Sequence, residues 1–456
     1  MEHIGSLGRR AVVVGAGMGG MMAAEVLSRF FEEVVVLEKD VLPTGVEART
    51  GVPQGAHAHA LLVQGRRNLE RLFPGLTSEL LDRGAVCLRS GLQFCVHDDE
   101  GWMPIRDVRL PMLAMSRPML EGAVRDYLKR NPRVCIREKT RFEGWTVSDE
   151  TITGVAVGGD DGDEIISCDL AIDASGRSGA SLSWLEAAGF GPVEEATMEI
   201  GTGYASAIFR KPAGWRSTVE CLSIHGRDPD TRGGFAFSVE NDHWLVSLTG
   251  RFDQAPRGDR DHFMAFAQNL CAPDIYDWIS QGEQVTPIKV YRAPISRWRR
   301  YERLERFPEA VLPLGDAIAH VNPVFGQGMT LASTHAASLM DLLAERAAAS
   351  EGLKGIAGPY FERTERFTET VWKGLENVEF SYVSTKGERP PDIESRMAYR
   401  RGLRRLIVED AEVHRLLVSV GHLVEPPDVL GRPDIAARVM QLIQPQGAAE
   451  TASACA

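Results

Sequence analysis

The most restrictive feature of this sequence is a glycine-rich turn that directly follows a short β-branched segment. Residues 11–14 read Ala-Val-Val-Val, and Gly15, Gly17 and Gly20 follow in the spacing GxGxxG. In a strand–turn–helix of this kind the first glycine permits the tight bend, the second lets a pyrophosphate approach the backbone, and the third lets the helix pack on the strand. The spacing therefore predicts a dinucleotide at this turn.

The residues that follow complete the unit that such a turn requires. Residues 21–31 have a helical pattern and residues 33–37 form a second β-branched segment, which gives a βαβ arrangement. Glu38 ends that segment about 20 residues beyond the glycines, where a carboxylate holds the hydroxyls of an adenosine ribose. Lys39 follows it in the candidate site. These residues predict dinucleotide binding and leave FAD and NAD as alternatives.

A second glycine-rich segment, at residues 311–330, favours FAD. The sequence Val-Leu-Pro-Leu-Gly-Asp-Ala predicts a buried strand that ends at an aspartate, which can accept a hydrogen bond from a ribityl or ribose hydroxyl. The Pro-Gly loop that follows leads into a helix, whose N-terminus can stabilise negative charge on the N1/C2=O edge of a reduced flavin. The candidate cofactor-binding residues of this segment are Asp316, Pro323, Gly326, Gly328 and Met329.

Taken together, the GxGxxG turn, Glu38 and the Gly-Asp, Asn-Pro and Gly-Gln-Gly-Met groups of residues 315–329 resemble the flavoprotein monooxygenases of the para-hydroxybenzoate hydroxylase fold. The resemblance implies FAD as the cofactor. Ser-Arg-Pro at 116–118 resembles the segment in which an arginine at a helix start reaches FAD, so Arg117 joins the candidate residues. Asp173 stands where the hydroxylases carry an Asp-Gly pair that touches FAD and the path of NAD(P)H, although here the residues read Asp-Ala-Ser-Gly-Arg.

A longer motif resembles one subgroup of these monooxygenases in particular. Residues 49–62 read RTGVPQGAHAHALL and are followed by Leu-Phe-Pro-Gly at 72–75; both resemble the bacterial polyketide and polyene epoxidases of polyether biosynthesis, which are related to squalene epoxidase. This similarity implies an enzyme of secondary metabolism, such as antibiotic biosynthesis. Such an enzyme transfers one oxygen atom of O2 from a flavin C4a-hydroperoxide to an alkene of a lipophilic polyketide or terpenoid intermediate. It also implies that Arg49 and the 51–59 loop lie beside the flavin.

Two other reactions remain open at this stage. An aromatic hydroxylase of the same fold would act on a phenol, although residues 196–300 contain no compelling tyrosine–histidine pair to activate one. A flavin-dependent dehydrogenase or prenyl reductase would transfer no oxygen, and residues 173–179 also resemble prenyl reductases and halogenases. The halogenase signature WxWxIP is absent from the sequence, which argues against halogenation.

Epoxidation requires no side-chain base, because an alkene needs no deprotonation, so the sequence assigns no catalytic residue outright. The candidates are Arg49, His57 and His320, the histidines because imidazole can exchange a proton near neutral pH. His57 and His59 could share one face of a strand as metal ligands. No carboxylate accompanies them, and we predict no metal site.

Electrons can reach the flavin by two routes. The sequence contains one GxGxxG motif, so a separately folded NAD(P)H domain is not expected. NAD(P)H must then bind transiently to the FAD-binding domain, or a partner flavin reductase must deliver the electrons.

The order of the predicted elements indicates an α/β protein. A GxGxxG Rossmann-like FAD-binding domain is interrupted by an antiparallel β-sheet substrate domain and followed by a helical C-terminal region. Strand-like runs at 204–209, 233–239 and 243–250 form that sheet. Because side chains alternate along a strand, about half of their bulky residues should face away from the substrate. The predicted ranges are 1–85, 111–190 and 301–350 for the FAD-binding domain, 86–110 and 191–300 for the substrate domain, 351–445 for the C-terminal helices and 446–456 for a disordered tail.

Charge and composition exclude other classes of protein. The 456 residues are 44% hydrophobic, as in ordinary globular proteins, and the net charge of −12 argues against a nucleic-acid partner. Seven scattered cysteines without CxxC spacing fit a reducing compartment. The longest run without polar residues, 11–24, is too short and glycine-rich to span a bilayer. We expect a cytoplasmic protein without a signal peptide or an integral membrane segment.

Overall fold

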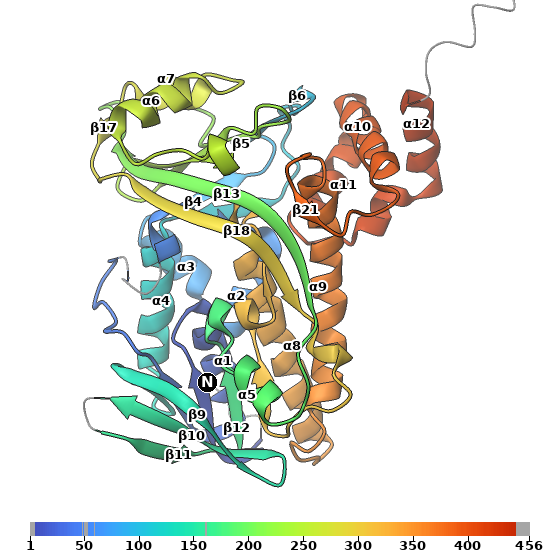
Figure 1. Ribbon diagram of the computed structural model, residues 1–456. Helices are drawn as coiled ribbons and strands as arrows, with labels where there is room; N and C mark the ends of the chain where they lie inside the picture. Colours follow the sequence, from blue (N-terminus) through green and yellow to red (C-terminus); the bar gives the residue numbers. More distant parts are fainter. Residues whose placement is uncertain (1–4, 48, 50–52, 59, 160–161, 444–456) are drawn as a thin grey trace, which may run out of the picture.

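The computed structural model describes residues 5–47, 49, 53–58, 60–159 and 162–443, and its elements are arranged around two main sheets (Figure 1). The first is a parallel sheet with the strand order β19-β12-β1-β2-β8. Because β1 is the middle strand, the glycine turn that follows it lies at the centre of one sheet edge. The strands are β1 (Gly8–Val14), β2 (Phe31–Leu37), β8 (Val134–Arg137), β12 (Leu170–Asp173) and β19 (Val311–Pro313).

The strand β1 is apolar at successive positions because both faces of its sheet are covered, as parallel sheets require. Ala11 and Val13 belong to the core formed with a layer of helices. Val12 and Val14 pack against a three-stranded antiparallel sheet on the other face. The helices of the first layer include α1 (Met18–Leu27), α4 (Arg117–Lys129) and α8 (Gly328–Ala348), and the small sheet is β9 (Thr140–Ser148), β10 (Thr151–Gly159) and β11 (Glu164–Ser167).

The second main sheet is larger and mostly antiparallel, with the order β20-β18-β13-β16-β15-β14-β5-β6 and with β17 and β21 paired to β13. Its long strands β13 and β18 curve from α6 and α7 toward α9 (Figure 1). The strands are β5 (Phe94–Asp98), β6 (Gly101–Trp102), β13 (Glu195–Arg210), β14 (Cys221–Ile224), β15 (Gly233–Val239), β16 (His243–Arg251), β17 (Glu283–Gln284), β18 (Lys289–Arg299), β20 (Ala319–His320) and β21 (Lys386–Gly387).

The two faces of this sheet bury different aromatic residues. Phe209 and Trp244 pack under α6 (Arg260–Gln268) and α7 (Asp274–Ile279). Phe235 and Phe237 belong to the opposite face, where they pack with a short sheet. The expected alternation is thereby confirmed, since the aromatic residues are divided between the two faces of the sheet. The short sheet contains β3 (Ala60–Leu61), β4 (Val86–Arg89) and β7 (Pro111–Ala114).

The C-terminal region is helical. Figure 1 shows α9 running beside α8, and the three helices that follow form a small bundle with its own core. The helices of this region are α9 (Ala357–Glu379), α10 (Ile393–Glu409), α11 (Ala411–Gly421) and α12 (Pro433–Ile443), and the remaining helices are α2 (Val63–Leu72), α3 (Leu76–Asp82) and α5 (Leu182–Ala187).

The structure confirms the α/β fold class, the parallel FAD-type sheet, the antiparallel sheet and the helical C-terminal region. One local expectation was wrong, and two features were not expected. The helix expected at 21–31 ends at Leu27, because buried Phe31 already begins β2. The two features that were not expected are the short sheet in which β4 pairs with β7 and the sheet formed by β9, β10 and β11. The domain boundaries stay predictions, and the tail at 446–456 lies outside the described residues.

Over the ranges that the structure describes, no helix combines the length and the apolar character that crossing a bilayer requires.

Candidate functional site

The glycine turn forms a backbone-lined wall at the end of β1. Gly15 has a φ of 102°, which is left-handed backbone that favours glycine. A Cβ on Gly20 would stand 1.8 Å from the Gly15 carbonyl oxygen, so α1 can cross the end of β1 only because Gly20 has no side chain. At Gly17 a Cβ would meet no atom within 4 Å. The protein's own packing therefore leaves space at Gly17, as the approach of a pyrophosphate requires.

That space belongs to a cavity of about 790 Å³ along the edge of the parallel sheet. Glu38 follows β2 on one side of the glycine turn, and Asp316 follows β19 on the other side. The two carboxylates therefore mark opposite sides of a cavity whose middle is backbone. Of the predicted site residues, those that line it are Gly15, Gly17, Glu38, Lys39, Arg49, Arg117, Asp316, His320, Pro323, Gly326, Gly328 and Met329.

Glu38 is held rigidly at its side of the cavity. Its carboxylate accepts hydrogen bonds from the backbone N–H groups of Ala16 and Asp40, both at 3.1 Å. The Arg49 guanidinium donates to the same carboxylate at 2.5 Å and to the Ala16 carbonyl oxygen at 2.9 Å. Arg49 is thus placed at the Glu38 side, and its role beside the flavin ring stays a prediction.

At the other side, Asp316 contacts a histidine. The Nδ1 atom of His320 lies 3.1 Å from the Asp316 carboxylate. Removal from water raises the pKa of Asp316, but the hydrogen bond and charge of His320, with the charges of Arg117 and Arg177, outweigh it and hold this pKa below its ordinary value. A charged acceptor is therefore available for a cofactor hydroxyl.

Two predicted cofactor-binding residues do not line the cavity. Gly20 acts through the packing of α1, as described above. Asp173 is fully buried, and its carboxylate accepts from the Ser175 N–H and hydroxyl, at 3.1 and 2.6 Å, and from the Ser181 N–H at 2.8 Å. It therefore shapes the 174–180 loop, which does line the cavity. Sequence reasoning missed the contribution of that loop, including Arg177, and of Thr140, Arg141 and Phe142.

His57 lies outside the lining of this cavity, beneath the large sheet. Its Nδ1 atom is 2.7 Å from the Ser206 hydroxyl, and its ring centroid is 5.8 Å from that of Tyr204 and 5.6 Å from that of Tyr291. Burial lowers the pKa of His57 to about 4. The Nε2 atom is buried and has no hydrogen-bond partner in the described structure. His59 lies outside the described residues.

The hydrogen-bond chain behind His57 indicates which nitrogen carries the proton. Ser247 accepts from the Ala58 N–H at 2.9 Å, and its hydroxyl lies 2.6 Å from that of Ser206. With Ser247 donating to Ser206, and Ser206 donating to Nδ1 of His57, both hydroxyl protons of the chain have an acceptor. This direction leaves the ring proton on Nε2.

Comparison with known proteins identifies the family of this chain. A family model described as "FAD binding domain" matches residues 9–357. Protein Rv3254 of Mycobacterium tuberculosis is 32% identical to this chain over 399 residues, which cover 84% of this chain and 83% of that protein.

Solved structures share the fold at lower identity. A probable FAD-dependent monooxygenase, PqsL of Pseudomonas aeruginosa, has a TM-score of 0.60 at 20% identity and covers 82% of this chain and 98% of its own. The p-nitrophenol 4-monooxygenase PnpA of Pseudomonas putida has a TM-score of 0.64 at 17% identity, with 93% and 99% covered. The flavin-dependent halogenase CmlS has a TM-score of 0.64 at 17% identity, with 87% and 71% covered. Flavin-dependent monooxygenases and halogenases therefore share this fold.

Replacing Gly17 with valine tests the cavity directly. The new side chain would enter the open space without striking the protein, so we expect the fold to persist while the Kd for FAD rises at least about tenfold, or 1.4 kcal/mol. Flavin absorbance per mole of purified protein and thermal melting measure the two effects. Gly374→Val is the matched control, because a Cβ there also meets no atom within 4 Å but lies in α9, and it should retain FAD. Stoichiometric FAD in Gly17→Val would contradict the assignment.

His57 provides a second test. With a pKa of about 4 instead of the ordinary 6.5, its ring should remain neutral at pH 6 and above and gain a proton only near pH 4. Nitrogen-15 NMR of histidine-labelled protein should show the proton on Nε2, and Ser206→Ala should shift the ring toward the Nδ1–H form. Titration near pH 6.5, or a proton on Nδ1 in the unmodified protein, would refute this arrangement.

Proposed function

This chain belongs to the FAD binding domain family, and from that premise we propose that it is an FAD-dependent monooxygenase acting on a lipophilic, unsaturated small molecule. The reaction proposed is the transfer of one oxygen atom from O2 to an alkene, which gives an epoxide. The electrons come from NAD(P)H, bound transiently or acting through a flavin reductase.

The residues of the cavity fit FAD. The backbone at Gly17 is open to a pyrophosphate and Gly15 lines the same cavity, while Glu38 and Asp316 can accept from sugar and ribityl hydroxyls. The helix α8 begins at Gly328 without a side-chain cap, so backbone N–H groups at its first turn can meet the polar edge of the ring. Bound FAD, once reduced, supplies the chemistry that activates O2.

One observation supports a lipophilic substrate above all: the loop whose residues line the cavity packs against the aromatic face of the large sheet through Val324. Val324 stands in the loop at 323–329, whose neighbouring residues line the cavity. It packs against Tyr204 and Tyr291 and also against the cluster that contains Phe235 and Phe237. The loop beside the cavity is thus backed by apolar and aromatic side chains.

Epoxidation is favoured over other oxygen transfers by what this face contains. Its cluster consists of phenylalanine, leucine, valine, methionine and alanine side chains and of Cys221, whose buried thiol has a pKa well above its ordinary value, so no member readily removes a proton. An alkene needs no such removal. The motif at residues 49–62 adds the likeness to polyene and polyketide epoxidases described above.

Hydroxylation of a phenol is the second candidate, and the position of His57 favours it. Residues 196–300 alone contain no compelling tyrosine–histidine pair. The structure brings His57 from a distant part of the chain to the side of Tyr204 and Tyr291, whose ring centroids lie 6.3 Å apart. A neutral imidazole with a free Nε2 could hold the hydroxyl oxygen of a phenol.

Product mass spectrometry under 18O2 tests the proposal. The FAD-loaded protein would receive NADPH, a general flavin reductase, and linear polyenes and phenols as substrates. One labelled oxygen on a polyene that has lost one double bond is the expected result. Label on a phenol ring would select the second candidate. Turnover that places no label on the product would contradict oxygen transfer and point to a dehydrogenase or reductase.

A further inference from the structure

The loop at 322–329 is called the flavin-side loop here, because the proposed function places the flavin beside it. Its first residue makes hydrogen bonds with three parts of the chain. Asn322 directly precedes Pro323 and is 1% exposed. Its side-chain oxygen accepts from the Val324 N–H at 3.2 Å and from the Tyr204 hydroxyl at 3.0 Å. Its side-chain nitrogen donates to Glu379 at 2.7 Å and to Thr202 at 3.3 Å. The amide thus uses both of its donors and both of its acceptor positions.

Glu379 determines which way that amide points. A carboxylate that also receives the Arg251 guanidinium acts as an acceptor, whereas the Val324 N–H can act only as a donor. The nitrogen of Asn322 must therefore face Glu379 and its oxygen must face Val324. Burial, and then the charge of Glu379, raise the pKa of Tyr204 well above its ordinary value, so the Tyr204 hydroxyl keeps its proton and donates.

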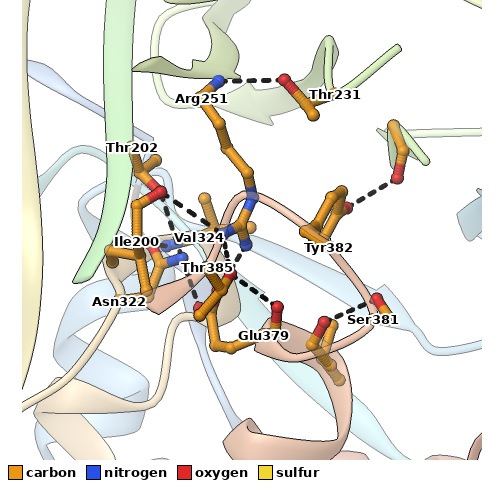
Figure 2. A network of polar contacts seen from close by, with 12 residues as sticks. Ile200, Thr202, Thr231, Arg251, Asn322, Val324, Glu379, Ser381, Tyr382 and Thr385 are labelled. Carbon is orange, nitrogen blue, oxygen red and sulfur yellow. Dashed lines mark hydrogen bonds and ion pairs between the residues drawn. The ribbon is translucent and has the colours of Figure 1, made fainter. Parts of the chain in front are cut away.

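Glu379 is itself held in place by Arg251 and Thr385, as Figure 2 shows. It is the last residue of α9, is 0% exposed, and pairs with Arg251 of β16. Arg251 also donates to the Thr385 hydroxyl at 3.2 Å and lies 3.8 Å from the ring centroid of Tyr382. The Thr385 hydroxyl closes the group by donating to the Glu379 carbonyl oxygen at 2.7 Å.

We propose that Glu379 is a positioning residue, which sets the conformation of the flavin-side loop at 322–329 by orienting the amide of Asn322. Glu379 lies beyond residue 357, where the family match ends. The C-terminal region therefore completes a site whose other parts belong to the FAD-binding domain. The assignment of this loop to the flavin rests on the proposed function, whereas the link from Glu379 to the loop rests on the contacts alone.

Glu379→Gln tests the link with little change in size. The charged Arg251 takes the stronger hydrogen bond and claims the glutamine oxygen. The glutamine nitrogen then faces the nitrogen of Asn322, and the Asn322 amide must turn its own nitrogen toward the Val324 N–H. We expect the Val324 amide to exchange with deuterium about tenfold faster, because its N–H loses the Asn322 oxygen as acceptor. We also expect a changed visible circular dichroism spectrum of bound FAD.

Glu376→Gln is the matched control. It makes the same chemical change three residues earlier on α9, at a carboxylate whose partner is Arg396 at 3.9 Å. It should alter neither the exchange of Val324 nor the flavin spectrum. If Glu379→Gln fails to fold, Asn322→Leu breaks the same link without altering a charge, and it should speed the exchange of Val324 to the same extent.

Unchanged Val324 exchange in Glu379→Gln, or in Asn322→Leu, would overturn the proposal and leave the Arg251 pair as a packing contact. Exchange is measured on the protein with and without FAD. A protein that binds no FAD but shows the expected exchange would refute the proposed function and retain the positioning role. FAD binding with unchanged Val324 exchange would retain the proposed function and refute the positioning role.

Discussion

The close approach of Gly20 to the Gly15 carbonyl is the constraint on which the site depends. It allows α1 to begin directly at the end of β1, so that backbone, and not side chains, forms the middle of the cavity wall. Because Val12 and Val14 pack against the small sheet while Ala11 and Val13 pack under helices, β1 is anchored on both faces. A rigid strand thus presents an open glycine turn.

The remaining parts of the site are added around that turn by segments far apart in the sequence. Glu38 and Asp316 follow two strands of the same parallel sheet on either side of β1, which places a carboxylate on each side of the glycines. The large sheet contacts the loop at 322–329 through Val324, and α9 contacts the same loop through Asn322. The loop at 322–329 is therefore the place where the nucleotide-binding part, the sheet and the C-terminal region meet.

Local sequence patterns predicted the parts of the site that local structure builds. Gly17, Glu38 and Asp316 are each fixed by a strand end or a turn, and all three line the cavity. The pairing of His57 with Ser206, 149 residues away, and of Arg251 with Glu379, 128 residues away, carries no local signal. Such pairs depend on how a sheet and a helix pack together, which alternation and spacing do not specify. Asp173 is intermediate between these two cases. Its place at a strand end was predicted, but its carboxylate holds the 174–180 loop and does not line the cavity.

The crystal structure of the FAD-loaded protein would test the central claim, that this cavity holds FAD in one direction. The account predicts the adenosine ribose hydroxyls within hydrogen-bonding distance of Glu38, the pyrophosphate against the backbone of Gly15 and Gly17, and the flavin ring beside residues 323–329. A flavin ring at the Glu38 side, or FAD bound outside this cavity, would contradict it.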